Sequence, residues 1–99
     1  LTARLKQVFE STLGTDKVSV DEPSMGGEDF SRYGREGIPI LMYRLGSVHQ
    51  SRLDRFKALG VPAPSLHSSQ YYPDVEPTLT TGVLTMTGAA LDLLKKPSP

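Results

Sequence analysis

The most continuously apolar stretch of the chain covers residues 38–45. Runs of this kind are typical of strands covered on both faces, as in α/β sheets. Its proline, Pro39, stands near the start of the run, where a strand tolerates it. Residues 17–21 alternate apolar and polar side chains, which predicts a second, half-buried strand. Together the two segments predict a small sheet and an α/β fold.

Helices are predicted before and after these strands in the sequence. Residues 1–14 carry one apolar stripe at helical spacing and end at a glycine, a common helix stop. The stripe consists of Leu1, Leu5, Val8, Phe9 and Leu13. The chain opens inside this pattern without an initiator methionine, so we expect it to be a segment of a longer protein.

A terminal helix is predicted over residues 78–96, with Pro77 at the favoured first position and two lysines at the carbonyl end. Gly82 and Gly88 weaken it by about 1 kcal/mol each relative to alanine, and their small size would allow close packing on a sheet. One helical face collects most of its apolar residues, namely Leu79, Val83, Met86, Ala90, Leu91 and Leu94.

Two further segments lie between these elements. Residues 24–36 predict a Gly-Gly loop followed by a short helix, with acidic Glu28 and Asp29 suited to its first turn. Residues 46–77 predict a long loop, within which Leu53, Phe56 and Leu59 would support a short helix between residues 51 and 60. Loops of this length inside a compact domain are usually functional or partly structured.

Composition excludes several classes of function. Eleven basic and eleven acidic residues give a net charge of zero, which disfavours nucleic acid and anionic membranes as partners. No stretch approaches the ~20 apolar residues that span a bilayer. The absence of cysteine rules out disulfides and thiolate metal sites and fits a reducing compartment. We therefore expect a cytoplasmic protein.

The residues that could perform chemistry are few. His67 stands in a stretch with two prolines before it and two after it, namely Pro62, Pro64, Pro73 and Pro77. Because proline restricts the backbone, this stretch is predicted to be a stiff loop. A single histidine is more often a hydrogen-bonded loop residue than a metal ligand, because metal sites need several ligands. His49 stands beside polar residues and is expected to be solvated. The pair Gly26-Gly27 lacks the remainder of a phosphate loop and is common in ordinary turns.

The order of the motifs adds to this inventory. MGGEDFS at residues 25–31, an apolar strand, LHSS at residues 66–69 and a terminal helix opened by Pro77 follow one another. In this order they resemble the C-terminal portion of metal-dependent amidohydrolases and peptidases, the family of hippurate hydrolase, N-acyl-amino-acid hydrolases, aminoacylases and zinc carboxypeptidases. The resemblance implies the C-terminal segment of one catalytic domain, with helices packed on a small sheet that is incomplete in this chain.

What the resemblance implies for single residues is specific. The histidine of the LHSS motif, here His67, would be a ligand of one of two divalent metals, usually zinc, bound as neutral imidazole. Gly26, Gly27 and Glu28 would line the metal cleft, with Glu28 as a carboxylate near the pocket and not a ligand. The substrate would be an N-acyl amino acid or a small peptide, and the parent enzyme would be a homo-oligomer.

Much of the family's catalytic set has no match in these residues. The other metal ligands, the bridging carboxylate and the glutamate that acts as general base lie upstream in the family, as does its separate lid and dimerisation domain. No catalytic residue is therefore assigned, and the chain alone is expected to be inactive and to hold no tightly bound metal. The alternative hypothesis is a stand-alone small α/β module that binds a protein partner through its long loop.

Overall fold

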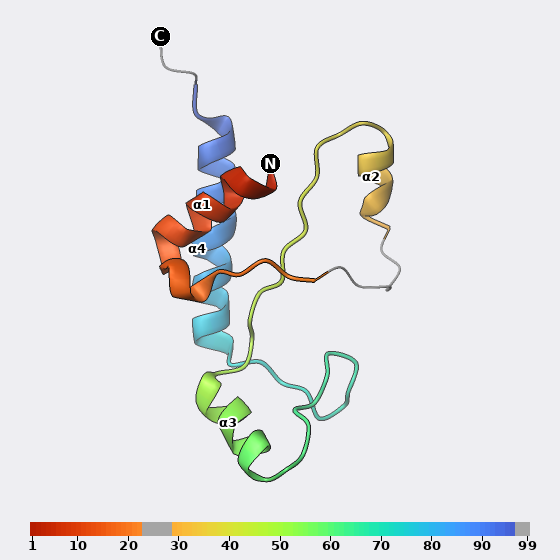
Figure 1. Cartoon of the computed structure of the whole chain (residues 1–99), viewed down its shortest axis with the longest axis vertical. Coiled ribbons are helices and arrows are strands. Elements are labelled where there is room, and N and C mark those ends of the chain that lie inside the picture. The colour runs from red at the N-terminus through yellow and green to blue at the C-terminus, as the bar shows by residue number, and fades with distance from the viewer. Residues whose placement is uncertain (23–28, 97–99) are drawn as a thin grey trace. The chain divides into compact units, whose positions relative to one another are not determined.

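In a computed structural model, residues 1–22 and 29–96 are described, and within them the chain is helical (Figure 1). The α-helices are α1 (Thr2–Leu13), α2 (Ser31–Arg35), α3 (Gln50–Ala58) and α4 (Val75–Leu94), and a 3-10 turn, η1 (Thr15–Lys17), follows α1. Neither described range contains a strand. The predicted α/β fold with its incomplete sheet is therefore wrong.

The two predicted strands explain the error. Residues 17–21 and 38–45 have no regular secondary structure apart from Lys17 in η1, and no backbone hydrogen bond joins the two segments. A strand is stable only when its amide and carbonyl groups pair with a neighbour. The apolar pattern is used in another way, because Val18, Leu41 and Tyr43 pack on a core formed by helices.

The chain divides into two compact units, Leu1–Arg44 with Leu84–Pro99 and Leu45–Val83. Helix α4 contributes its second half to the first unit and its beginning to the other. None of the described helices combines the length and apolar character needed to cross a membrane.

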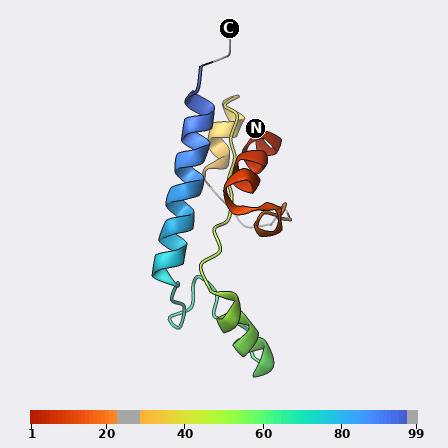
Figure 2. The ribbon, with the colours of Figure 1, turned by 90° about the vertical axis from the view of Figure 1, so that its left-hand side faces the viewer.

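The first unit is built on α1 and the second half of α4, which lie side by side in Figures 1 and 2. The predicted stripe of α1 faces inward, with Leu5 and Phe9 buried, and Gly14 ends the helix with a φ of 95° that suits glycine. The Phe9 ring packs on Tyr43 with ring centroids 4.9 Å apart. The helix predicted over residues 1–14 is thus confirmed.

Polar contacts close the same unit. The Tyr43 hydroxyl is 3.0 Å from the hydroxyl of Thr85, which is buried on α4. At the other end of α1, Arg4 donates from Nε to Asp92 Oδ2 and from Nη2 to the Asp92 carbonyl, both at 2.7 Å. These bonds fix the orientation of α1 against α4, because they tie both a side chain and the backbone of the partner helix.

Helix α4 presents its small residues to α1, and not its large ones. Thr85 and Ala89 are buried, while a Cβ on Gly88 would lie 3.4 Å from Val8. The large apolar residues predicted to share one face are exposed, with Leu79 at 62% and Leu94 at 80%. The helix itself was predicted close to its observed bounds, whereas its packing on a sheet was wrong, since the described residues contain no sheet to receive it.

The second unit joins α3 to the beginning of α4. Helix α3 begins one residue before the short helix that was predicted between residues 51 and 60 and ends two residues earlier, and Phe56 is its half-buried aromatic residue. The Thr78 amide donates to the Asp74 carbonyl, so Pro77 stands at the third position of α4 and not at the first. This position is tolerated because the first amides of a helix have no partner within it.

We predict that Phe9→Ala lowers the free energy of unfolding by about 3 kcal/mol, because it empties the largest part of a core with few buried apolar side chains. Chemical unfolding followed by circular dichroism would measure the loss. Tyr33→Ala removes an exposed aromatic ring and serves as the control. Equal losses in the two variants would contradict the assignment of Phe9 to the core.

Gly88→Ala is predicted to stabilise the protein by about 0.5–1 kcal/mol, because alanine has the higher helix propensity. The new methyl group would make ordinary van der Waals contacts with Val8 and Thr12 of α1. A thermal melt compared with that of the unmodified chain would test this gain. A lower melting temperature would show that α1 and α4 approach more closely than these contacts indicate.

Candidate functional site

His67 lies on a tight turn in the second unit. The Ser68 amide donates to the Ser65 carbonyl at 3.0 Å, and the Tyr71 amide donates to the Ser68 carbonyl at 3.1 Å. The Ser68 hydroxyl accepts a hydrogen bond from the Gln70 amide. The turn leaves His67 exposed, beside Leu66 with 69% of its surface exposed. The imidazole is therefore presented to solvent by a hydrogen-bonded backbone.

Two tyrosines secure the segment that follows this turn. The Tyr71 hydroxyl is hydrogen-bonded to the Ser47 hydroxyl. The Arg52 guanidinium lies 3.8 Å from the centroid of the Tyr72 ring and donates to the Tyr72 carbonyl from both terminal nitrogens at 3.3 Å. A cation over an aromatic face is attractive, so helix α3 holds the segment that carries His67 through Arg52.

Asp74 is the centre of the polar contacts in this unit. Its Oδ2 accepts from the His49 amide at 2.6 Å and from Arg52 Nη1 at 3.0 Å, while its own amide donates to the Ser47 carbonyl at 2.7 Å. The hydrogen bond from the His49 amide lowers the pKa of Asp74, burial opposes the shift, and the Arg52 guanidinium reinforces it. The ionised carboxylate thus joins the start of α4 to the start of α3.

His49 has a structural role that the sequence analysis missed. Its Nδ1 accepts from the Ser51 amide at 3.1 Å and lies 2.8 Å from the Ser51 hydroxyl, so the imidazole caps the N-terminus of α3. The prediction of an exposed His49 is confirmed. Its position directly before a helical pattern was the signal that pointed to a cap.

The His67 side chain differs from that of His49, because it does not cap a helix. No hydrogen bond or ion pair to the His67 side chain is present among the residues that the structure describes. Within residues 1–22 and 29–96, no group of three or more histidine or acidic side chains is placed to hold a metal ion. The donor set is thus a single available imidazole, short of the three protein ligands of a typical catalytic zinc.

The other predicted site residues, Gly26, Gly27 and Glu28, lie outside the described residues. The first described residue after them is Asp29, whose carbonyl accepts from the Arg32 amide at the start of α2. Asp29 therefore lies two residues before α2 and not in its first turn, where it was predicted.

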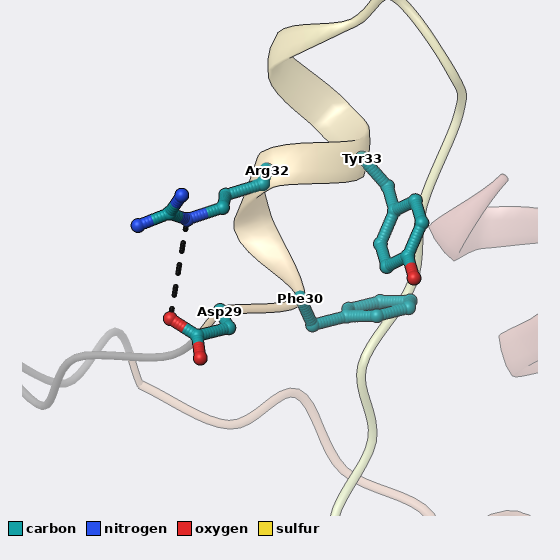
Figure 3. A pocket seen from close by; sticks show the side chains of 4 residues that line it. All are labelled: Asp29, Phe30, Arg32 and Tyr33. Atoms are coloured by element: carbon teal, nitrogen blue, oxygen red, sulfur yellow. Dashed lines mark ion pairs between the residues drawn. The ribbon is translucent and has the colours of Figure 1, made fainter.

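A surface hollow lies on and beside α2 (Figure 3). It is lined by Asp29, Phe30, Arg32 and Tyr33, and the two aromatic rings are 5.6 Å apart. The ion pair between Asp29 and Arg32, at 4.0 Å, joins side chains that are 98% and 81% exposed. Exposed pairs of this kind contribute little free energy. Because these lining side chains are almost fully exposed, the hollow is an open surface and not an enclosed binding site.

Comparison of the chain with protein-family models, with curated protein sequences and with solved structures found no match. A functional assignment therefore depends on the motifs and on the chemistry of the residues described above.

We predict that Asp74 stabilises the second unit in a pH-dependent way. A lowered pKa in the folded state means that the contribution is complete above the unfolded value of about 3.8 and is lost as the pH falls through the lower folded value. Asp74→Asn should therefore be less stable than the unmodified chain at neutral pH, and the difference should shrink as the pH falls below about 4.

Urea unfolding followed by circular dichroism at a series of pH values would measure this difference. Asp54→Asn removes one negative charge from a side chain that accepts a hydrogen bond from Gln50, one turn earlier on α3, and so controls for net charge. A stability difference for Asp74→Asn that is independent of pH would contradict the role of the ionised carboxylate.

Proposed function

We propose that this chain is part of a metal-dependent amidohydrolase that cleaves the amide bond of N-acyl amino acids or small peptides, and that His67 is a ligand of one of its divalent metals. The observation that carries the proposal is the contrast between the two histidines. His49 uses its Nδ1 to cap α3, whereas the His67 imidazole is exposed and makes no hydrogen bond within the described residues.

The chemistry of the loop suits this role. Zinc is bound by neutral imidazole nitrogen, and a ligand that is already oriented loses little freedom on binding. The turn at Ser65–Ser68 and the anchor of Tyr72 on Arg52 restrict the segment on both sides of His67. Zinc would supply a polarising charge for the substrate carbonyl, and His67 would contribute by holding that charge in place.

One imidazole does not complete a metal site. The remaining ligands and the general base would have to come from residues other than those described, so we expect the 99 residues alone to have no useful hydrolytic activity. In the assembled enzyme, Gly26 and Gly27 would let substrate approach the backbone closely, and Glu28 would lie at the edge of the pocket. The absence of cysteine suits a reducing, cytoplasmic setting.

A second candidate function is a protein-interaction module without catalytic activity. The observation that favours it is the exposed apolar surface of α4, where Val83, Met86 and Leu91 are each at least 60% exposed. Surfaces of this kind mark interaction sites more often than catalytic ones.

The test uses the protein encoded by the complete open reading frame that contains this chain, loaded with zinc and assayed for release of free amino acid from N-acyl amino acids. We predict that His67→Ala lowers kcat/KM by about 100-fold or more, because even residues that only support a metal ligand are worth 10- to 100-fold. Bound zinc, measured by mass spectrometry of the metal content, should fall in parallel.

The matched control is His49→Asn, which removes the other imidazole and keeps a residue favoured as a helix cap. It should retain both zinc content and turnover. Turnover like that of the unmodified enzyme after His67→Ala would exclude His67 as a ligand. A protein that hydrolyses no amide substrate with or without zinc would favour the interaction module.

A further inference from the structure

Helix α4 carries a continuous apolar surface on the side away from its buried residues. We define the apolar face as Leu79, Val83, Met86, Ala90 and Leu94, which follow one another at intervals of three or four residues and are all exposed. Its four large members are between 60% and 80% exposed. Leu93 and Leu91 flank it on either side and are also exposed. A contiguous apolar patch of this length is unusual on an isolated chain and indicates a binding surface.

The charges of α4 indicate what covers this face. No charged residue occurs between Pro77 and Leu91, whereas Glu76 lies in the first turn and Lys95 and Lys96 directly follow the last. Asp92, in the last turn, is paired with Arg4 and with Lys95. The start of the helix is thus acidic, and its end, counted with Arg4 and the two lysines, is basic, which matches the macrodipole at each end. A partner that complements the face must be apolar along its middle, basic beside Glu76 and acidic beside Lys96.

A second copy of α4 in the opposite direction meets these requirements. If Leu79 of one copy lies beside Leu93 of the other, Met86 falls near the two-fold axis, and the acidic first turn of each copy lies next to the end of the other helix that Lys95 and Lys96 follow. The macrodipoles are then antiparallel, which is favourable, whereas a parallel pair would bring like charges together. A symmetric contact uses the same patch on both chains, so one unpartnered face is sufficient.

We propose that the apolar face of α4 is the interface through which two copies of this chain associate as an antiparallel helix pair. The 20 residues of α4 make the contact about 30 Å long, at 1.5 Å of rise per residue. This association goes beyond the proposed hydrolase and requires neither a metal nor a substrate.

The chain has no cysteine, so single introduced cysteines can map the contact in the full 99 residues. Met86→Cys should form a disulfide-linked dimer under mild oxidation. A mixture of Leu79→Cys and Leu93→Cys should form mixed dimers in preference to either homodimer. In the antiparallel pair two copies of residue 79 are about 21 Å apart along the axis, which a disulfide does not span.

Sedimentation of the unmodified chain over a range of concentrations should show a reversible monomer–dimer equilibrium. Met86→Glu should weaken the dimer by about tenfold or more, because a carboxylate would be buried at the contact without a partner. Ala90→Glu repeats the test one turn further along the apolar face. Val20→Glu makes the same kind of change at an exposed apolar residue outside α4 and should leave the dimer intact.

Circular dichroism of each variant would check that the helix content of the chain is retained. A chain that stays monomeric at submillimolar concentration would overturn the proposal and leave the face to another protein or to a larger polypeptide. Self-linking of Leu79→Cys would overturn it in favour of a parallel pair. A dimer that Met86→Glu and Ala90→Glu leave unchanged would place the interface elsewhere and overturn it as well.

Discussion

The close approach of α1 to α4 is the constraint on which the rest of the first unit depends. Gly88 and Ala89 leave room for Val8 and Phe9, and the Arg4–Asp92 pair holds the helices at the other end of the contact. Because small side chains face α1, the leucines and the methionine of α4 are directed outward. The arrangement of small residues that allows α4 to pack tightly on α1 therefore leaves an apolar surface on the outer side of α4.

The helices could be predicted from sequence because their signals are local. The stripe containing Leu5 and Phe9 and the stop at Gly14 locate α1, and α3 follows from the spacing of Leu53 and Phe56. The strands could not be predicted in the same way, because a strand depends on a partner strand at any distance along the chain. Residues 38–45 have the composition of a buried strand, yet Leu41 and Tyr43 bury part of their surface against helices.

The features of the candidate site were likewise predicted only in part. The prolines predicted a stiff segment around His67, and in the structure Arg52 also holds this segment, because it stacks on Tyr72 and binds Asp74. No sequence pattern predicted that contact, since it joins residues about twenty positions apart. The role of His49 was within reach, because a polar side chain before a helical pattern indicates a cap, although histidine is not the residue usually found there.

The cap formed by His49 has a chemical consequence for the whole chain. Because Nδ1 accepts a hydrogen bond from a backbone amide, the neutral ring carries its proton on Nε2, and the tautomer is set by the helix. A metal ion that coordinated Nδ1 would have to displace the first hydrogen bond of α3, so coordination there would compete directly with helix formation. His67 faces no such competition within the described residues. The fold thus distinguishes two chemically identical side chains, because a backbone amide occupies the Nδ1 lone pair of His49, whereas no hydrogen bond to the His67 ring is present within the described residues.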